Sequence, residues 1–338
     1  MASLHNRVNR KELREKMRNS TEERMTISFY RYAKIDNPQA FRDDLYRQWE
    51  KLGVMGRTYV AYEGINAQIS LPKANFEQFR TELYQISFLN GCRLNIAIDD
   101  DGKSFFKLTI KLREQIVSDG IEDPSFNPAN TGVHLNAKDF NEKLEADNII
   151  LVDMRNFYES EVGHFKGAIT PEVENFRESL PIIADMLAEN KDKTMLMYCT
   201  GGIRCEKASA YMKHRGFENV FQLEGGIIEY TRQCRNLGVP NKFLGKNFVF
   251  DERLSERISD DIIAKCHQCG TTCDTHHNCS NVACNTLFIQ CPECAAKYEG
   301  TCSTECQEII HLPAEQFEEI KRHPKEGKNK RIFARKMA

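Results

Sequence analysis

Residues 193–216 decide the fold at the centre of this chain, and they read KTMLMYCTGGIRCEKASAYMKHRG. The apolar run MLMY is typical of a buried strand, and EKASAYMKHRG has the composition of a helix. A short loop with two glycines stands between them. A strand, a glycine loop and a helix in this order predict an α/β unit, whose reactive groups lie at the carboxyl ends of strands. Cys199 follows the strand directly and is the first candidate for chemistry.

The same alternation of strands and helices extends to both sides of this stretch. Two further buried strands, IILVDM and NVFQLEG, begin at residues 149 and 219, and a helix-like segment, ENFRESLPIIADMLAEN, begins at residue 174. Strands that alternate with helices predict a parallel sheet with helices on both faces. We place this α/β domain at residues 131–240.

The N-terminal part has a different pattern, which predicts a ferredoxin-like α+β domain at residues 25–115. Strand-like runs (MTISFYRY, RTYVAY, INAQISL) alternate with helix-like stretches (PQAFRDDLYRQWEKL, NFEQFRTELYQI), and FFKLTIKL closes the unit. The order is therefore β-α-β-β-α-β. An extension at residues 1–24 precedes this domain, and a linker with Pro124 and Pro128 follows it at residues 116–130.

Length and composition set outer limits. A chain of 338 residues, 41% hydrophobic and 28% charged, is expected to form two or three domains. Its net charge of −2 gives no general attraction to nucleic acid, so any such attraction must come from local patches. The sequence lacks a run of about 18 apolar residues, which argues against a membrane span. The first twenty residues mix both charge signs and do not resemble a signal peptide.

The loop after Cys199 is suited to stabilising an anion. Backbone N–H groups of such a loop converge on its centre, and the helix that begins near Arg204 adds positive potential. We therefore predict a lowered thiol pKa and a catalytic nucleophile at Cys199. The supporting residues of the loop are Thr200, Gly201, Gly202, Ile203 and Arg204.

Two details of this loop narrow the chemistry. Cysteine phosphatases have one more residue between Cys and Arg than the four found here, so phosphatase activity is disfavoured. Cys205 follows Arg204 and has two open interpretations. It either resolves a disulfide or persulfide formed on Cys199 or is simply buried in the first turn of the helix.

Two motifs give the α/β domain a resemblance to the rhodanese family. LVDMRNFYESEVGHFKGAI, at residues 151–169, is similar to the first signature of that family, and CTGGIR, which begins at Cys199, is similar to its active loop. The resemblance implies that Asp153 and Arg155 support the active loop. A fold-supporting ion pair without a catalytic duty is the alternative for these two residues.

The segment at residues 241–320 is rich in cysteine. Two pairs have the Cys-x2-Cys spacing of structural zinc sites. Nine thiols exceed the eight that two tetrahedral sites need, so the pairing stays open. A reducing, cytoplasmic compartment fits this usage, because no export signal precedes it; disulfides and an iron–sulfur cluster are the alternatives to zinc. The candidate ligands are Cys266, Cys269, Cys273, Cys279, Cys284, Cys291, Cys294, Cys302 and Cys306.

A basic tail at residues 321–338 ends the chain. Such a run of cations either contacts RNA phosphates or is a solvated terminus, and both interpretations stay open. Its cations are Lys321, Arg322, Lys325, Lys328, Lys330, Arg331, Arg335 and Lys336.

The combination of these parts resembles the bacterial rhodanese-like tRNA uridine hydroxylases, on the segments CTGGIRCEK, FVFDERLSERIS and CHQC. The resemblance implies oxygen-dependent conversion of the wobble uridine of tRNA to 5-hydroxyuridine. Molecular oxygen is then a co-substrate, the anticodon region of tRNA is the partner, and Cys199 is the essential cysteine. We see no flavin, haem or nicotinamide motif. The alternatives are a sulfurtransferase with a persulfide on Cys199 and an interaction module that only binds.

Overall fold

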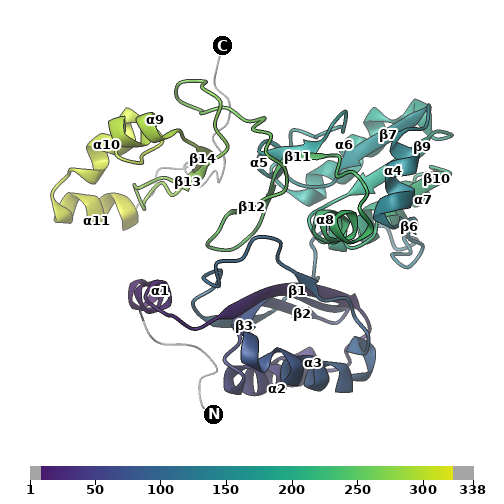
Figure 1. Ribbon diagram of the computed structural model, residues 1–338, viewed down its shortest axis with the longest axis horizontal. Helices are drawn as coiled ribbons and strands as arrows, with labels where there is room; N and C mark the ends of the chain where they lie inside the picture. The colour runs from purple at the N-terminus through teal and green to yellow at the C-terminus, as the bar shows by residue number, and fades with distance from the viewer. Residues whose placement is uncertain (1–8, 323–338) are drawn as a thin grey trace.

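The computed structural model describes residues 9–322, and Figure 1 shows how its elements are arranged. The N-terminal elements are α1 (Arg10–Arg18), β1 (Arg24–Tyr32), α2 (Pro38–Lys51), β2 (Met55–Ala61), β3 (Gly64–Pro72), η1 (Lys73–Asn75), α3 (Phe76–Gln85), η2 (Ser87–Leu89), β4 (Asn95–Ile96) and β5 (Leu108–Leu112). No helix in the described residues is both long and apolar enough to cross a membrane.

The central elements carry the parallel sheet and the helices around it. They are β6 (Val133–Leu135), α4 (Ala137–Leu144), β7 (Ile149–Asp153), α5 (Phe157–Ser160), β8 (Gly163–Phe165), α6 (Phe176–Met186), η3 (Ala188–Asn190), β9 (Thr194–Tyr198), α7 (Ile203–His214), β10 (Asn219–Leu223) and α8 (Gly226–Leu237). The C-terminal elements are β11 (Phe243–Phe248), β12 (Ser255–Arg257), β13 (His276–Asn278), β14 (Leu287–Ile289), α9 (Pro292–Lys297), α10 (Thr304–Ile310) and α11 (Ala314–Arg322).

The N-terminal domain is a five-stranded sheet in the order β4-β1-β3-β2-β5, with α2 and α3 on one face. The expected α+β domain is confirmed, but the position of its last strand is not. The segment FFKLTIKL does not close the sheet beside β1. Instead β5 lies parallel to β2 at the opposite edge, and the two-residue β4 pairs with β1.

A side chain explains why β4 is so short. The backbone N–H of Ala97 still donates to the Thr26 carbonyl oxygen at 3.0 Å. The N–H of Thr26 donates instead to the Asp100 carboxylate, at 2.6 Å. Because a side chain takes the position that the ladder would use next, pairing along β1 ends there and the chain crosses to the far edge.

The central domain is the expected parallel α/β unit. Its sheet has the order β6-β10-β9-β7, and every pairing in it is parallel. One apolar core lies between the sheet and α6 and α7, and a second contains residues of α4 and α8, so helices cover both faces. Helix α7 begins at Ile203, next to the expected start.

The chain beyond residue 241 first remains attached to the central domain. Strand β11 pairs antiparallel with β8 and with β12. A hairpin of β13 and β14 and the short helices α9, α10 and α11 then form the cysteine-rich part (Figure 1). Of the basic tail, only Lys321 and Arg322 are described, as the end of α11; its remaining cations lie outside the described residues.

The face of the N-terminal sheet that α2 and α3 leave uncovered is turned toward the central domain (Figure 1). A buried cluster of charges fastens the contact. Lys207, on α7, lies 2.9 Å from a Glu63 carboxylate oxygen and 2.5 Å from one of Asp119, and its side chain is 2% exposed. Its ammonium also donates to the Val117 carbonyl oxygen at 3.1 Å. One lysine therefore joins the first domain, the linker and the central domain.

Replacement of Lys207 by methionine is expected to lower the free energy of unfolding by about 3 kcal/mol, because it leaves the buried Asp119 carboxylate without its cation. Urea unfolding of the full chain measures the change. The exposed Lys138→Met serves as the control and is expected to stay within about 0.5 kcal/mol of the wild type. Equal stability of both variants would refute the proposed importance of the cluster.

Candidate active site and metal centres

The thiol of Cys199 lies at the carboxyl end of β9, where the active loop turns into α7. The backbone N–H of Gly202 donates to its sulfur at 3.1 Å. Gly202 has φ of 97°, a left-handed conformation that favours glycine, and a Cβ there would come within 2.9 Å of the Tyr30 hydroxyl. Glycine is therefore required at this position by both the backbone and its neighbour.

The loop stabilises the thiolate of Cys199 although the residue is buried. Burial by itself raises the pKa of this thiol. A hydrogen bond from the Cys205 side chain, the charge of Arg204 and the backbone N–H groups of both residues lower the pKa, and together they outweigh the effect of burial. The resulting pKa is about 6, so the thiolate predominates at neutral pH. The expected lowering is confirmed in direction.

Cys205 has the opposite electrostatic character. Burial, together with its hydrogen bond to Cys199 and the charge of that neighbour, raises its pKa well above the usual value. Cys205 is therefore a protonated donor to the Cys199 thiolate in this structure. A resolving role for it in a disulfide or persulfide stays a prediction.

A relay of two buried ion pairs holds the loop in place. The guanidinium of Arg204 donates to both carboxylate oxygens of Glu159, at 2.6 and 2.8 Å, and to the Thr200 hydroxyl at 3.2 Å. Arg155 pairs with Asp153 at 2.6 Å and also donates to the Glu159 carbonyl oxygen at 3.4 Å. Asp153 and Arg155 thus lie behind the loop, where Arg155 contacts the backbone of Glu159 and also lies over the ring of Tyr198, 5.8 Å from its centre.

Glu159 was not among the residues selected from the sequence, although it lies inside the quoted signature. Its only local signal is its position three residues after Asn156, where the two form a capping box at the start of α5. Capping explains its presence without the active site. Its contact with Arg204, 45 residues away, depends on the tertiary fold.

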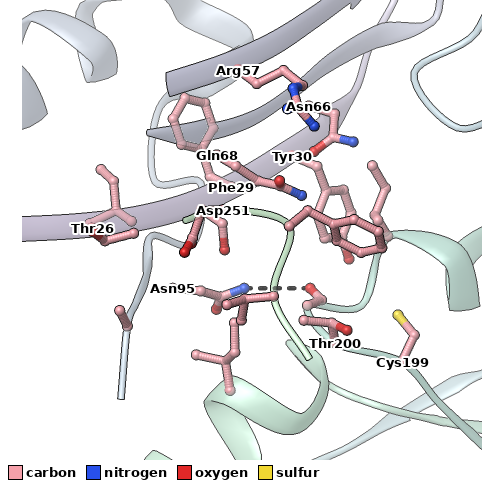
Figure 2. A pocket seen from close by; sticks show the side chains of 18 of the residues that line it. Thr26, Phe29, Tyr30, Arg57, Asn66, Gln68, Asn95, Cys199, Thr200 and Asp251 are labelled. Atoms are coloured by element: carbon pink, nitrogen blue, oxygen red, sulfur yellow. Dashed lines mark hydrogen bonds between the residues drawn. The ribbon is translucent and has the colours of Figure 1, made fainter. Parts of the chain in front are cut away.

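A cavity of about 330 Å³ opens between the active loop and the uncovered face of the N-terminal sheet (Figure 2). Cys199, Thr200 and Gly201 line one side of it. The opposite side is polar and comes from four strands of the N-terminal sheet, β1, β2, β3 and β4. Its members include Tyr30, Arg57, Asn66, Gln68 and Asn95.

The two walls of the cavity are joined by hydrogen bonds. The Tyr30 hydroxyl donates to the Glu206 carboxylate at 2.8 Å, and the Asn95 amide donates to the Gly201 carbonyl oxygen at 3.4 Å (Figure 2). Behind the loop, the N–H of Ile227 donates to the Cys199 carbonyl oxygen at 3.0 Å. No local pattern marks Tyr30 or Asn95 as site residues, because both lie in ordinary sheet segments.

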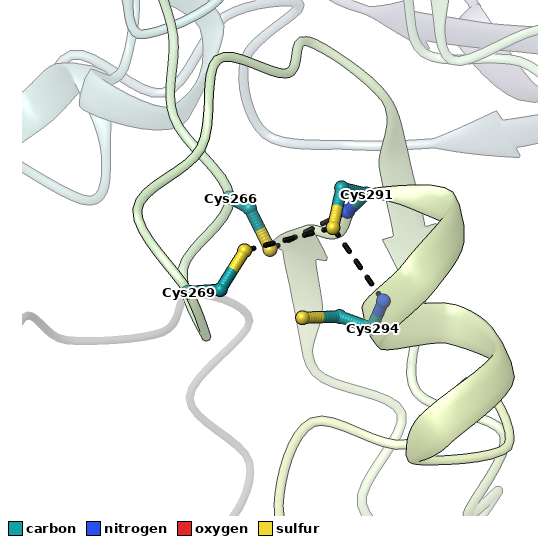
Figure 3. Close-up of side chains that lie close together, drawn as sticks. All are labelled: Cys266, Cys269, Cys291 and Cys294. Atoms are coloured by element: carbon teal, nitrogen blue, oxygen red, sulfur yellow. Dashed lines mark hydrogen bonds between the residues drawn. The ribbon is translucent and has the colours of Figure 1, made fainter.

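The cysteine-rich part brings eight thiols into two groups. In each group the four sulfur atoms lie within 4.8 Å of one another, and the described residues contain no disulfide. The groups could each hold a metal ion. Their members are Cys266, Cys269, Cys291 and Cys294 in the first, shown in Figure 3, and Cys279, Cys284, Cys302 and Cys306 in the second.

The spacing of the sulfurs fits a single tetrahedral ion in each group. Four thiolates at a zinc–sulfur distance of about 2.3 Å are separated by roughly 3.8 Å. Cys269 and Cys291 are 3.6 Å apart, and Cys284 and Cys302 are 3.7 Å apart. Cys273, expected among the candidate ligands, lies outside both groups, and its thiol donates to the Gln290 carbonyl oxygen at 3.4 Å.

Comparison with known proteins relates all of these parts to one family. A tRNA uridine(34) hydroxylase of Pectobacterium atrosepticum is 58% identical over 95% of this chain and 91% of its own length. One of Photorhabdus laumondii is 58% identical over 93% of this chain and 89% of its own length. The chain belongs to the tRNA uridine(34) hydroxylase family.

Domain families match the corresponding parts of this family member. A UPF0176 acylphosphatase-like domain matches residues 24–116, a rhodanese-like domain residues 136–233, and a rhodanese C-terminal domain residues 244–307. A solved rhodanese-like domain from Anabaena is 21% identical with a TM-score of 0.27, and covers 33% of this chain and 78% of that domain. The resemblance inferred from the sequence is confirmed, including the rhodanese-like centre.

Neutralising the ion pair beside the thiolate is expected to change the reactivity of Cys199. The double variant Arg204→Gln, Glu159→Gln removes both charges without stranding either one. Loss of the Arg204 charge raises the pKa of Cys199. Alkylation by iodoacetamide requires the thiolate, so the midpoint of its rate against pH should lie about one pH unit above that of the wild type.

The wild-type profile is expected to rise near pH 6, the pKa of the Cys199 thiol. Arg204→Lys keeps the positive charge and is the control; its profile should stay close to that of the wild type. Coincident profiles for the wild type and the double variant would mean that the backbone N–H groups and Cys205 alone stabilise the thiolate.

Proposed function

We propose that this chain hydroxylates the wobble uridine of tRNA, with Cys199 as its catalytic nucleophile. Its membership of the tRNA uridine(34) hydroxylase family supports the reaction. The observation that carries the residue assignment is the cavity, because a stabilised thiolate faces a polar wall there across a space of about 330 Å³. The same comparisons favour hydroxylation over sulfur transfer.

The cavity has the chemistry that a single uracil base requires. Enzymes that modify a base take it out of the stack and bind it by hydrogen bonds to its edge. Three side-chain amides line the wall opposite the thiolate, and each offers both a donor and an acceptor. They belong to Asn66, Gln68 and Asn95. We assign them to the carbonyl and N–H groups of uracil.

In this scheme the chain has a defined chemical task. The Cys199 thiolate adds to the uracil ring and is released as thiolate when the hydroxylated base forms, while Arg204 and the loop N–H groups stabilise its negative charge before the addition and after the release. Molecular oxygen is the proposed co-substrate. One oxygen atom enters the base. The other takes up two electrons and two protons from a separate reductant and leaves as water. We further propose that the protein acts in the cytoplasm, where thiols remain reduced.

Replacement of Cys199 by serine is expected to abolish hydroxylation and to preserve the fold, because a hydroxyl is a far weaker nucleophile at neutral pH. The purified protein is incubated with unmodified tRNA, a thiol reductant and ¹⁸O₂, and the nucleosides are analysed by mass spectrometry. The wild type should place one labelled oxygen in a uridine, whereas the variant should leave the tRNA unchanged.

A parallel incubation with thiosulfate and cyanide tests the sulfurtransferase alternative. Rapid formation of thiocyanate by a protein that leaves tRNA unlabelled would reject the proposed reaction. Labelled oxygen in tRNA treated with the Cys199→Ser variant would show that the reaction does not need Cys199. It would reject the proposed role of this residue but not the proposed hydroxylation. Circular dichroism of the variant verifies that its fold is retained.

We propose zinc as the metal of both thiol groups, because tetrahedral sites of four thiolates suit this ion. Backbone N–H groups also point at the sulfurs: that of Cys291 donates to Cys266 at 3.4 Å, and that of Cys302 to Cys279 at 3.3 Å. Such bonds stabilise bound thiolates. When bound, the ion holds the short elements of this part together, which have few apolar residues to do so.

Elemental analysis of the purified protein should give two zinc ions per chain, one for each group. Cys291→Ser is expected to lower the content to one, because it disrupts the first group only. Cys273→Ser is the control and should retain both, since Cys273 belongs to neither group. Iron with visible absorbance, or intact thiols without metal, would contradict the assignment.

A further inference from the structure

A second cleft, with a volume of about 530 Å³, adjoins the cavity of the active loop. It runs along strand β5 of the N-terminal sheet, and the segment that follows β11 and the β13–β14 hairpin form its other walls. The cleft and the cavity share five lining residues, so the two spaces are neighbours. These are Arg57, Phe105, Val249, Phe250 and Asp251, two of which Figure 2 labels.

Three cations give this cleft its charge. Arg57 lies on β2, Lys107 lies just before β5 and Lys111 lies on β5. The strand register places all three on the uncovered face of the sheet. All three are exposed, and none forms an ion pair with another described residue. They are therefore available to an external anion.

The acidic side chains of the cleft do not offset this charge, because each already has a cation. Asp251 pairs with Arg253 at 2.6 Å, and Glu252 pairs with Arg14 at 2.9 Å. The chain's own terminal segment, residues 323–338, is rich in lysine and arginine and is unsuited to a basic cleft. Charge therefore points to a polyanion from outside the chain.

Aromatic rings add a second kind of contact. Phe106, Tyr158 and Phe250 line the cleft together with the cations. Proteins that bind single-stranded nucleic acid combine a positive groove for the phosphates with aromatic rings on which bases stack. Both features lie here beside the cavity to which we assign the uracil base.

We propose that this cleft binds the nucleotides that flank the target uridine, with Arg57, Lys107 and Lys111 on their phosphates. The ligand is the single-stranded RNA of the anticodon loop. This inference rests on the proposed function for the identity of the RNA. It assigns substrate positioning to the N-terminal sheet and its neighbouring hairpin, at residues outside the active loop.

The triple variant Arg57→Gln, Lys107→Gln, Lys111→Gln tests the proposal by equilibrium binding, without reference to activity. The probe is a fluorescent, unmodified anticodon stem-loop RNA, and its affinity for the full chain is measured over a series of salt concentrations. Each lost phosphate contact makes the negative slope of log K against log salt shallower by about 0.7. The slope of the triple variant should therefore be shallower by about 2, and its affinity for the RNA should be lower on the order of tenfold.

A matched control removes three exposed lysines that line neither space. Lys51→Gln, Lys138→Gln, Lys191→Gln has the same change in net charge as the triple variant. Its slope should stay close to that of the wild type. Equal losses in the two triple variants would reduce the effect to general charge, and an unchanged slope in the cleft variant would exclude phosphate contacts there. Either outcome overturns the proposal.

Cross-linking supplies the position of the RNA in the cleft. A photoreactive 5-iodouridine is placed next to the target nucleotide, and the attached peptides are identified by mass spectrometry. Attachment to residues 104–111 or 248–254 supports the proposal, and attachment elsewhere only contradicts it. Because these measurements need no turnover, they stand even if the wild type does not hydroxylate tRNA. Conversely, if the wild type hydroxylates tRNA and the cleft variant binds the RNA as tightly as the wild type, the RNA-binding role of the cleft is rejected and the proposed function is not.

Discussion

The buried negative charge on Cys199 is the constraint around which the active loop is organised. An anion in a dry environment must be compensated by donors and cations, or it takes up a proton. Here the compensation comes from the Gly202 N–H, the Cys205 thiol and the Arg204 guanidinium. Arg204 is itself buried, so it needs a carboxylate partner that does not neutralise its effect on the thiolate.

Glu159 supplies that carboxylate, and it also accepts a hydrogen bond from the Thr200 hydroxyl of the loop at 3.4 Å. The carboxylate is fully buried and receives two hydrogen bonds from Arg204. Its backbone is fixed in turn by Arg155, which Asp153 holds at the end of β7. Asp153 and Arg155 form a buried ion pair that contacts Glu159, and their support of the active loop stays a prediction. Breaking a buried pair of this kind is costly, which makes the arrangement rigid.

The central domain by itself would present the thiolate loop on an open surface. The N-terminal sheet closes that surface, with Tyr30 and Asn95 contacting the loop and Lys207 fastening the two domains through Glu63. The cysteine-rich part also contributes, since its β13–β14 hairpin forms one wall of the neighbouring cleft. The chain thus assembles a buried thiolate, a cavity and a cleft from different domains, and each of these depends on how the domains are placed relative to one another.

Local pattern determined much of this protein. Three patterns are visible along the chain itself: the alternation of strands and helices, the glycine loop after a buried strand, and the Cys-x2-Cys pairs. They were enough to predict the parallel sheet, the position of Cys199 in its loop and a cysteine-rich part whose thiols could hold metal ions. The position of β5 was not, because Asp100 ends the pairing of β1 from outside the strand. Glu159, Tyr30 and Asn95, the division of the cysteines into two groups and the exclusion of Cys273 were decided only by tertiary structure. The physical reason is common to all of them: their roles depend on distances between segments far apart in the sequence, and no local preference encodes such a distance.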